Sequence, residues 1–389
     1  MRICVVYDCL FPHTVGGAER WYRNLSERLA REGHDVTYLT MRQWDAGGAD
    51  VPTGVTVRAV APQMALYTRS GRRRIGPPLV FGLGVLGHLL VRGRRYDVVH
   101  TASFPYFSLL AAAIARPFAR FRLVVDWHEV WSRDYWREYL GAAGIAGWAI
   151  QALCARPRQA AFCFSRLHGR RLAQIGLRTQ PTILEGEYAG DRGRPQPSPP
   201  EPVVLFAGRH IPEKQVTALI PAMLRVRAQV PEMRCEIYGD GPERAAVERM
   251  VAEHSAEDAV AIRGFVPAEE LAEALRRASC MVLPSRREGY GLVVVEAAAA
   301  GTASVVVAGP DNAATELVED GRNGFIAPSA SPDDLSAAIV RVHTAGMALR
   351  EATAEWFAAN ADRLSLDGSL ERVLSSYRAG SALNRRHKA

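Results

Sequence analysis

The stretch Ser279-Cys-Met-Val-Leu-Pro-Ser-Arg-Arg-Glu-Gly-Tyr-Gly-Leu-Val-Val-Val-Glu-Ala-Ala-Ala-Ala-Gly301 decides the fold. Its apolar run from Cys280 to Leu283 predicts a buried strand, and residues 292–300 predict an apolar helix that stops at Gly301. A glycine-containing turn, residues 288–291, joins the two. This order places free backbone N–H groups at a helix N-terminus, where phosphate binds readily.

Two carboxylates bracket this turn: Glu288 lies in the loop and Glu296 lies one turn into the helix. Carboxylates accept hydrogen bonds from sugar hydroxyls, so amides beside two glutamates suit a nucleotide-sugar. The alternative is that Glu288 is a solvated loop residue and Glu296 an exposed helix residue. The apolar neighbours of Glu296 weaken this alternative, because a buried carboxylate needs partners.

The whole motif, Pro-Ser-x-x-Glu-Gly-x-Gly-Leu-x-x-x-Glu-Ala, resembles the retaining glycosyltransferases of family 4. The resemblance covers nearly the whole chain and is most specific in residues 203–327. It implies the GT-B architecture, an α/β fold in which two Rossmann-like, doubly wound parallel-sheet domains face a central cleft. Two departures occur: Ala303 stands where a proline is usual, and Glu185-Gly-Glu187 replaces the common Asn-Gly-Val-Asp. The second departure concerns acceptor contacts or hinge geometry, not donor binding.

Composition predicts an ordinary cytoplasmic protein of two domains, with 389 residues, 48% apolar and 23% charged. The longest uncharged stretch, Ile75 to Val91, is too short and too rich in proline and glycine to span a membrane. The six cysteines are scattered without a Cys-x-x-Cys pair, which indicates reduced core residues. Because the chain also lacks an Asp-x-Asp motif, we expect no metal and no cofactor beyond the donor substrate.

Charge is distributed unevenly. Residues 1–190 contain 25 Arg and no Lys against 14 acidic residues, whereas residues 191–389 contain 23 basic and 27 acidic residues. A basic N-terminal half favours an anionic acceptor or the surface of an anionic membrane as a partner. The composition gives no indication of nucleic acid binding.

Apolar strand-like runs alternate with helical segments throughout, which predicts parallel sheets. A Pro- and Gly-rich segment near residues 186–202 divides the series in two. The resemblance implies that the last helix returns to the first domain, with a packing face of Leu370, Val373, Leu374 and Tyr377. The expected parts are an acceptor-side domain (1–186), a linker (187–202), a donor-side domain (203–345), C-terminal helices (346–380) and a basic tail (381–389).

In the N-terminal half, Gly16 and Gly17 precede a predicted helix and allow a ligand close to its backbone. The alternative is an ordinary strand-to-helix turn. His128 follows a predicted strand, among acids and indoles, where it is either structural or a hydrogen-bond donor to a sugar. The family resemblance implies that the glycine loop faces the donor and that His128 points at the donor sugar, although Glu129 follows where Asp is more common.

In the C-terminal half, Arg209 and Lys214 lie at a predicted strand-to-helix turn, which suits phosphate. The family resemblance implies that this pair binds the donor diphosphate and that the backbone near Val266 contacts the base. Arg209 and Lys214 are both also compatible with ordinary surface charge, and Val266 is compatible with a simple strand end. The amides of Gly291, Leu292 and Val293 complete the expected donor site.

Gly82-Leu-Gly-Val-Leu-Gly87 matches a dinucleotide-binding fingerprint by letter. Prolines precede it and no acidic residue follows at the required spacing, so we interpret it as part of an apolar helix. Arginines flank this helix at 72–74 and at 92–95. A buried helix with solvated ends and a helix resting on an anionic bilayer both fit the pattern.

Together with these residues, the family resemblance implies a retaining, metal-independent, hexosyltransferase-type enzyme. It would move a sugar from a nucleoside-diphosphate-sugar to a hydroxyl acceptor in cell-surface glycan or polysaccharide biosynthesis. Arg209, Lys214, Glu288 and His128 are the expected catalytic residues, and Glu296 is expected to hold the ribose. Two alternatives remain open: a GT-B-like epimerase or phosphorylase, and a non-catalytic module that binds a nucleotide-sugar.

Overall fold

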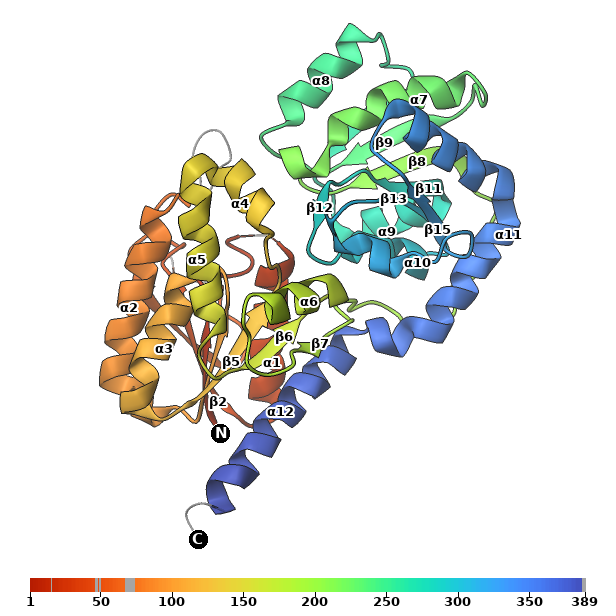
Figure 1. Ribbon diagram of the computed structural model, residues 1–389. Helices are drawn as coiled ribbons and strands as arrows, with labels where there is room; N and C mark the ends of the chain where they lie inside the picture. The colour runs from red at the N-terminus through yellow and green to blue at the C-terminus, as the bar shows by residue number, and fades with distance from the viewer. Residues whose placement is uncertain (15, 46–47, 49, 67–73, 387–389) are drawn as a thin grey trace. The chain divides into compact units, whose positions relative to one another are not determined.

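The computed structural model describes residues 1–14, 16–45, 48, 50–66 and 74–386. The chain folds into two compact units (Figure 1). Unit 1 comprises Met1–Glu185 with Asp367–Ala389, and unit 2 comprises Gly186–Leu366. The second segment of unit 1 consists of the C-terminal helix, so the chain leaves this unit and returns to it.

Unit 1 is built on a parallel sheet that has seven strands in the described part of the chain, in the order β3-β2-β1-β4-β5-β6-β7. The strands are β1 (Arg2–Val6), β2 (Asp35–Met41), β3 (Val55–Ala61), β4 (Val98–Ala102), β5 (Arg122–Trp127), β6 (Ala160–Cys163) and β7 (Thr182–Ile183). The helices are α1 (Gly17–Arg31), α2 (Gly76–Arg92), α3 (Phe107–Ala119), α4 (Arg133–Leu140), α5 (Gly144–Ala155), α6 (Arg166–Gln174) and α12 (Leu366–Arg386).

Unit 2 contains a parallel sheet with six strands among the described residues, in the order β10-β9-β8-β11-β13-β15. The strands are β8 (Glu201–Ala207), β9 (Arg234–Tyr238), β10 (Val260–Gly264), β11 (Ala278–Leu283), β13 (Ser304–Val307) and β15 (Gly324–Ala327), with a separate short pair, β12 (Arg287–Glu288) and β14 (Asp311–Asn312). The helices are α7 (Leu219–Arg227), α8 (Arg244–Glu253), α9 (Ala268–Arg277), α10 (Leu292–Ala299) and α11 (Pro332–Leu364).

Both sheets confirm the predicted α/β class with two parallel-sheet domains. Every residue of β4 and of β11 is buried, as expected for strands that are covered by helices on both faces. The carboxyl ends of such strands meet at one edge, where the loops carry most of the predicted site residues.

The glycine fingerprint is helical, as we interpreted it. Gly82 and Gly84 lie inside α2, where a Cβ on Gly84 would come within 1.9 Å of the Val60 carbonyl oxygen. A Cβ on Gly82 would come within 2.7 Å of the Phe107 Cβ. These glycines therefore allow α2 to pack closely on β3 and α3, which is a structural role. Of the arginines before this helix, Arg72 and Arg73 lie outside the described residues.

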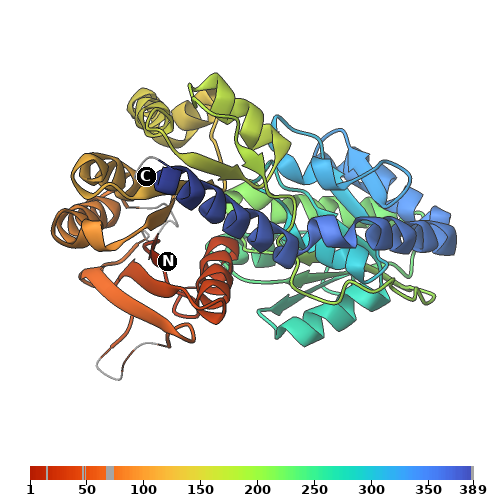
Figure 2. The ribbon, with the colours of Figure 1, turned by 90° about the horizontal axis from the view of Figure 1, so that it is seen from below.

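Helix α12 packs along unit 1 beside α1 (Figure 2). Ion pairs join the two helices, Arg28 to Asp367 at 3.2 Å and Arg378 to Glu32 at 3.1 Å. The apolar side chains expected to form its packing face are all buried: Leu370, Val373, Leu374 and Tyr377. The helix continues to Arg386, through most of the segment expected as a tail, and residues 387–389 lie outside the described part.

Several boundaries differ from the sequence-based expectation. The sequence predicts one helix over residues 213–230, but the structure has two 3-10 turns (Pro212–Lys214 and Val216–Ala218) followed by α7, because Gln215 adopts a left-handed conformation between the turns. Strands β12 and β15 were not predicted. The sequence also predicts a helix over residues 332–344; in the structure this helix continues to Leu364, with a break in helical geometry at Gly346.

Candidate functional site

The loops after β8 and β11 bring two predicted residues into direct contact. The Nζ atom of Lys214 lies 2.5 Å from Oε1 of Glu288, and both side chains are largely buried. An ammonium group has three donors, so the contact with Glu288 leaves two for a further acceptor such as a phosphate oxygen. The pair therefore holds a compact cation in a fixed place at the carboxyl edge of the sheet.

Further contacts fix these two loops to each other. The backbone N–H of Arg286 donates to the Glu213 carbonyl at 2.9 Å, and the Arg287 guanidinium lies 3.7 Å from the Glu213 carboxylate. The buried amide of Asn312 donates to the carbonyls of Ser285 and Val307. Glu288 is thus part of a short strand, β12, and not of a flexible turn as we expected.

Helix α10 begins directly after this contact. Gly291 is its N-cap, in the left-handed region with φ 101°, and no side chain in the described part of the chain caps the first turn. A Cβ at this position would also come within 2.7 Å of the Ala314 Cβ, so only glycine fits without strain. Leu292 and Val293 supply the first backbone N–H groups of the helix, and an anion is favoured at this end. Glu296 follows in the next turn and is half-buried.

The other two predicted residues of unit 2 are more exposed. Arg209 lies in the loop after β8 and has no ion-pair partner in the described part of the chain. Val266 is half-buried in the loop after the edge strand β10, which is separated from β11 by β9 and β8. The structure thus brings Lys214, Glu288 and the start of α10 together, with Arg209 earlier in the same loop as Lys214 and Val266 several strands away.

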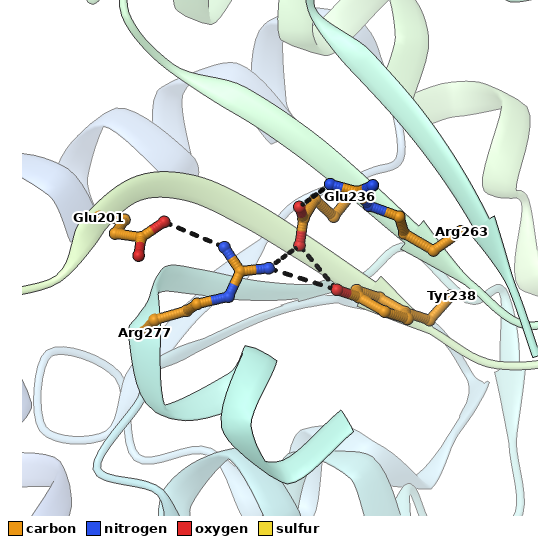
Figure 3. Close-up of polar contacts among 5 residues, drawn as sticks. All are labelled: Glu201, Glu236, Tyr238, Arg263 and Arg277. Carbon is orange, nitrogen blue, oxygen red and sulfur yellow. Dashed lines mark hydrogen bonds and ion pairs between the residues drawn. The ribbon is translucent and has the colours of Figure 1, made fainter. Parts of the chain in front are cut away.

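A cluster of polar and charged residues joins β8, β9, β10 and α9, near the strand that precedes Val266 (Figure 3). Glu236 on β9 is buried; Arg263 on β10 donates to it at 2.7 Å, the Tyr238 hydroxyl donates at 2.7 Å, and Arg277 donates as well. Arg277 also pairs with Glu201 at 3.0 Å. Burial raises the pKa of Glu236, but the hydrogen bonds from Arg263 and Tyr238 outweigh it, so the pKa lies below its ordinary value. The cluster contains two carboxylates and two guanidinium groups, which indicates a structural role.

In unit 1, His128 follows β5. Its ring stacks on Phe164 with centroids 4.5 Å apart and meets Tyr22 edge-on at 5.8 Å. Burial lowers the pKa of His128 to about 4, although the Asp126 carboxylate acts in the opposite direction. The ring is therefore neutral near pH 7, and its Nε2 atom has no hydrogen-bond partner among the described residues. A neutral imidazole can donate one hydrogen bond to a substrate hydroxyl or accept one from it.

A fully buried carboxylate, Asp126, lies two residues before His128 and was not predicted. Trp21 Nε1 donates to its Oδ2 at 2.7 Å, and His100 Nε2 lies 2.8 Å from its Oδ1. On the other side of the ring, Nδ1 of His100 and the Tyr377 hydroxyl form a hydrogen bond. Burial raises the pKa of Asp126, but the charge and hydrogen bond of His100 outweigh it and hold that pKa below its ordinary value.

These contacts form a chain, Trp21–Asp126–His100–Tyr377, that links α1, β5, β4 and α12. Its members come from distant parts of the sequence: Trp21 and Asp126 are 105 residues apart, and His100 and Tyr377 are 277 apart. The only sequence signal was an acidic residue inside an otherwise apolar strand. The chain fixes the end of β5 from which His128 projects.

Gly16 and Gly17 lie where α1 begins, as predicted. Gly16 is the N-cap in extended geometry, and a Cβ there would come within 2.4 Å of the Glu19 carboxylate. A Cβ on Gly17 would meet nothing within 4 Å. Space is therefore open at Gly17, whereas a side chain at Gly16 would displace the carboxylate of Glu19.

Among the residues that the structure describes, no three His, Cys, Asp or Glu side chains are grouped so that they could hold a metal ion. No helix there has the length and apolar character needed to cross a bilayer.

Two family models match the chain over most of its length. "Glycosyltransferase Family 4" matches residues 15–184, and "Glycosyl transferases group 1" matches residues 191–356. The second range contains the Lys214–Glu288 contact and the start of α10, and the first contains His128 and the Asp126 chain.

Curated relatives and solved structures agree with these matches. Glycogen synthase of Mycobacterium tuberculosis is 28% identical over 372 residues, 88% of this chain and 85% of that protein. The peptide N-acetylglucosaminyltransferase GtfA subunit of Streptococcus pneumoniae is 30% identical over 128 residues, 33% of this chain. The match covers only 25% of the length of GtfA. It covers only 16% and 36% of the length of two other curated relatives.

Among solved structures, HepE of Anabaena in complex with UDP superposes with a TM-score of 0.74 at 18% identity, over 97% of this chain and 100% of that one. Sucrose-phosphate synthase of Thermosynechococcus elongatus superposes with a TM-score of 0.79 at 20% identity, over 98% and 99%. At these identities the structures establish the fold.

Proposed function

Because the chain belongs to the GT-B glycosyltransferases of family 4, we propose that it transfers a sugar from a nucleoside-diphosphate-sugar to a hydroxyl acceptor with retention and without a metal. The observation that carries this proposal is the contact between Lys214 and Glu288 beside the uncapped N-terminus of α10. One small site then offers a cation and backbone N–H groups for a diphosphate and a carboxylate for hydroxyl groups.

The residues would divide the work as follows. Lys214, Arg209 and the first amides of α10 neutralise the charge that develops on the departing diphosphate, which stabilises the transition state. Glu288 accepts hydrogen bonds from sugar hydroxyls, and Glu296 from the ribose. His128, neutral at pH 7, contacts a hydroxyl of the donor sugar. No dedicated nucleophile is assigned; attack occurs on the face from which the phosphate leaves, and the leaving phosphate takes the proton of the acceptor.

Val266 in unit 2 and the Gly16–Gly17 turn in unit 1 are each proposed to contact the donor. The backbone near Val266 meets the base, and the space at Gly17 admits the sugar or diphosphate. HepE of Anabaena forms a complex with UDP, so UDP is the first nucleotide to test with this chain. A role in cell-surface glycan biosynthesis is part of this proposal.

Lys214→Ala tests the assignment. We expect a loss of about 2–4 kcal/mol of transition-state stabilisation, read as a fall in kcat/KM, because a preorganised charge donor is removed. A thermal-shift screen of nucleoside diphosphates first identifies the donor. Arg249→Ala, which removes an exposed cation elsewhere in unit 2, is the matched control. Unchanged kcat/KM in Lys214→Ala would contradict the proposed role.

The product distinguishes the alternative activities. A transferase releases a nucleoside diphosphate only with an acceptor present, whereas an epimerase converts the nucleotide-sugar alone. A non-catalytic module would bind the nucleotide-sugar, and Lys214→Ala would then weaken binding with no turnover in either protein.

We also propose that unit 1 contacts an anionic membrane peripherally. The 25 arginines against 14 acidic residues in residues 1–190 favour such a surface electrostatically. Wild-type binding to anionic vesicles, absent with neutral ones, is the expected result.

A further inference from the structure

An open hollow of about 540 Å³ lies between α2 and the edge strand β3 of unit 1. Arg58 comes from β3, and His88 and Arg92 come from the C-terminal half of α2. Gly87 also lines the hollow, and a Cβ at this position would meet nothing within 4 Å. The absence of a side chain at residue 87 therefore helps to keep the hollow open.

The hollow is positively charged and its cations are uncompensated. Among the described residues, neither Arg58 nor Arg92 has an ion-pair partner. His88 Nε2 hydrogen-bonds the Tyr96 hydroxyl at 2.8 Å. Burial lowers the pKa of His88, and the charges of Arg92 and Arg58 lower it further, so the ring stays neutral and can still donate or accept. The negative end of the α2 dipole accounts for a cation at Arg92, but not for Arg58 on the neighbouring strand.

Several large apolar side chains of α2 and of its N-cap residue are exposed. Ile75, Leu79, Leu83 and Leu90 recur at helical spacing and are between 42% and 68% exposed, and Val91 at the rim is 82% exposed. The next helix, α3, adds Phe118 at 61% exposed, whose carbonyl accepts a hydrogen bond from Arg94. Such a run of exposed apolar groups on one element is unusual for a surface that contacts only water.

We infer that the Arg58–His88–Arg92 hollow binds the phosphate of an anionic phospholipid headgroup while the exposed apolar face of α2 rests in the bilayer interface. Guanidinium groups bind phosphate oxygens in a bidentate manner, and apolar residues beside a phosphate site match the chemistry of a lipid, whose headgroup adjoins its acyl chains. A soluble phosphate compound would use the cations but not the apolar face. This inference rests on the proposed membrane contact of unit 1 and assigns it to one place.

Vesicle co-sedimentation tests the site in the full-length protein. The probes are vesicles of phosphatidylcholine alone and of equal parts phosphatidylcholine and phosphatidylglycerol. We expect the double variant Arg58→Ala/Arg92→Ala to bind the anionic vesicles about 30-fold more weakly, because two basic residues near the lipid surface are lost. Gly87→Leu, which fills the hollow but keeps both arginines, should weaken binding on the order of tenfold.

Controls separate this site from general charge and from misfolding. Arg178→Ala/Arg249→Ala removes the same charge from exposed positions elsewhere and should change binding less than about threefold. Each variant should unfold at the wild-type temperature. If the wild type binds no anionic vesicles, the membrane contact itself fails. If the wild type binds but both double variants weaken it equally, or Gly87→Leu has no effect, only the assignment to this hollow fails.

Inorganic phosphate is the last probe of the hollow. Titration of phosphate without lipid should give weak binding, and phosphate should compete only partly with the vesicles. Tight phosphate binding that Arg58→Ala/Arg92→Ala abolishes, without any effect of the same variant on vesicles, would make the hollow a site for soluble phosphate and would overturn the inference.

Discussion

Asp126 in unit 1 and Glu236 in unit 2 are both buried carboxylates on strands of a parallel sheet, but their partners differ. Asp126 is held by an indole N–H and an imidazole, both of which are buried. Glu236 is held by two guanidinium groups that reach solvent, with exposed fractions of 51% for Arg263 and 30% for Arg277. Removal of either carboxylate therefore leaves different groups behind: buried donors around Asp126, but cations that water can solvate around Glu236.

The two networks also support different parts of the molecule: the Asp126 network supports a proposed functional residue, whereas the Glu236 network has a structural role. The contacts of Asp126 join α1, which begins at the Gly16–Gly17 turn, to the strand that carries His128 and to α12. The contacts of Glu236 join the start of β8 and the end of α9 to the edge strand β10. The first network reaches a proposed catalytic residue within two positions, and the second ends three residues before Val266.

The largest effect is expected for Asp126→Asn. We expect the free energy of unfolding to fall by about 3–5 kcal/mol, because the charge is lost while Trp21 and His100 still direct hydrogens at the site, and the new amide group opposes one of them. Urea unfolding near pH 7 measures the loss. Asp97→Asn is the control, since Asp97 is 45% exposed and pairs only at the surface with Arg2. Equal losses in the two variants would remove the distinction.

Glu236→Gln should cost less, about 1–2 kcal/mol, because Arg263 and Arg277 can turn to water once the charge is gone. The same urea experiment compares it with Asp126→Asn, and Glu273→Gln serves as an exposed control that also pairs with an arginine. A loss as large as that of Asp126→Asn would mean that partner exposure does not decide the outcome.

Tyr377→Phe removes one hydroxyl from the end of the Asp126 chain and should lower the free energy of unfolding by about 1 kcal/mol. The measurement that distinguishes it is hydrogen exchange of the α12 amides, which should become faster while exchange in unit 2 is unchanged. Phe leaves the packing of the buried ring in place, so unchanged α12 exchange would show that the hydroxyl does not anchor the helix.

The fold could be predicted from the sequence because strands and helices produce local sequence patterns. The apolar runs at Val203–Ala207 and Cys280–Leu283 mark stretches of strand that are buried throughout, as in a sheet covered on both faces. Two-residue strands such as β12 and β14 carry no periodicity, so only the fold reveals them. The left-handed Gln215, which divides the predicted helix after β8, also has no local signature, since glycine or asparagine is the usual residue for that conformation.

The candidate site was predictable to the extent that it lies in loops next to each other in sequence. The spacing of Glu288, Gly291 and Glu296 is local, and the Lys214–Glu288 contact follows from the adjacency of β8 and β11. The support of His128 was not predictable, because His100 and Tyr377 meet only through the return of α12. The Arg58–Arg92 hollow depends in the same way on the packing of α2 against β3.

The smallest expected effect concerns acid. Both carboxyls have a folded pKa below the unfolded value, so each contributes stability above its unfolded pKa and loses it as the pH falls through its folded pKa. The ordinary values are 4.5 for Glu236 and 3.8 for Asp126. The stability difference between wild type and Glu236→Gln should therefore begin to shrink at a higher pH than the difference for Asp126→Asn, by less than about 1 kcal/mol at pH ~4. Urea unfolding of both variants from neutral pH downward measures this order. The reverse order would show that the buried partners of Asp126, and not the arginines of Glu236, release their carboxylate first.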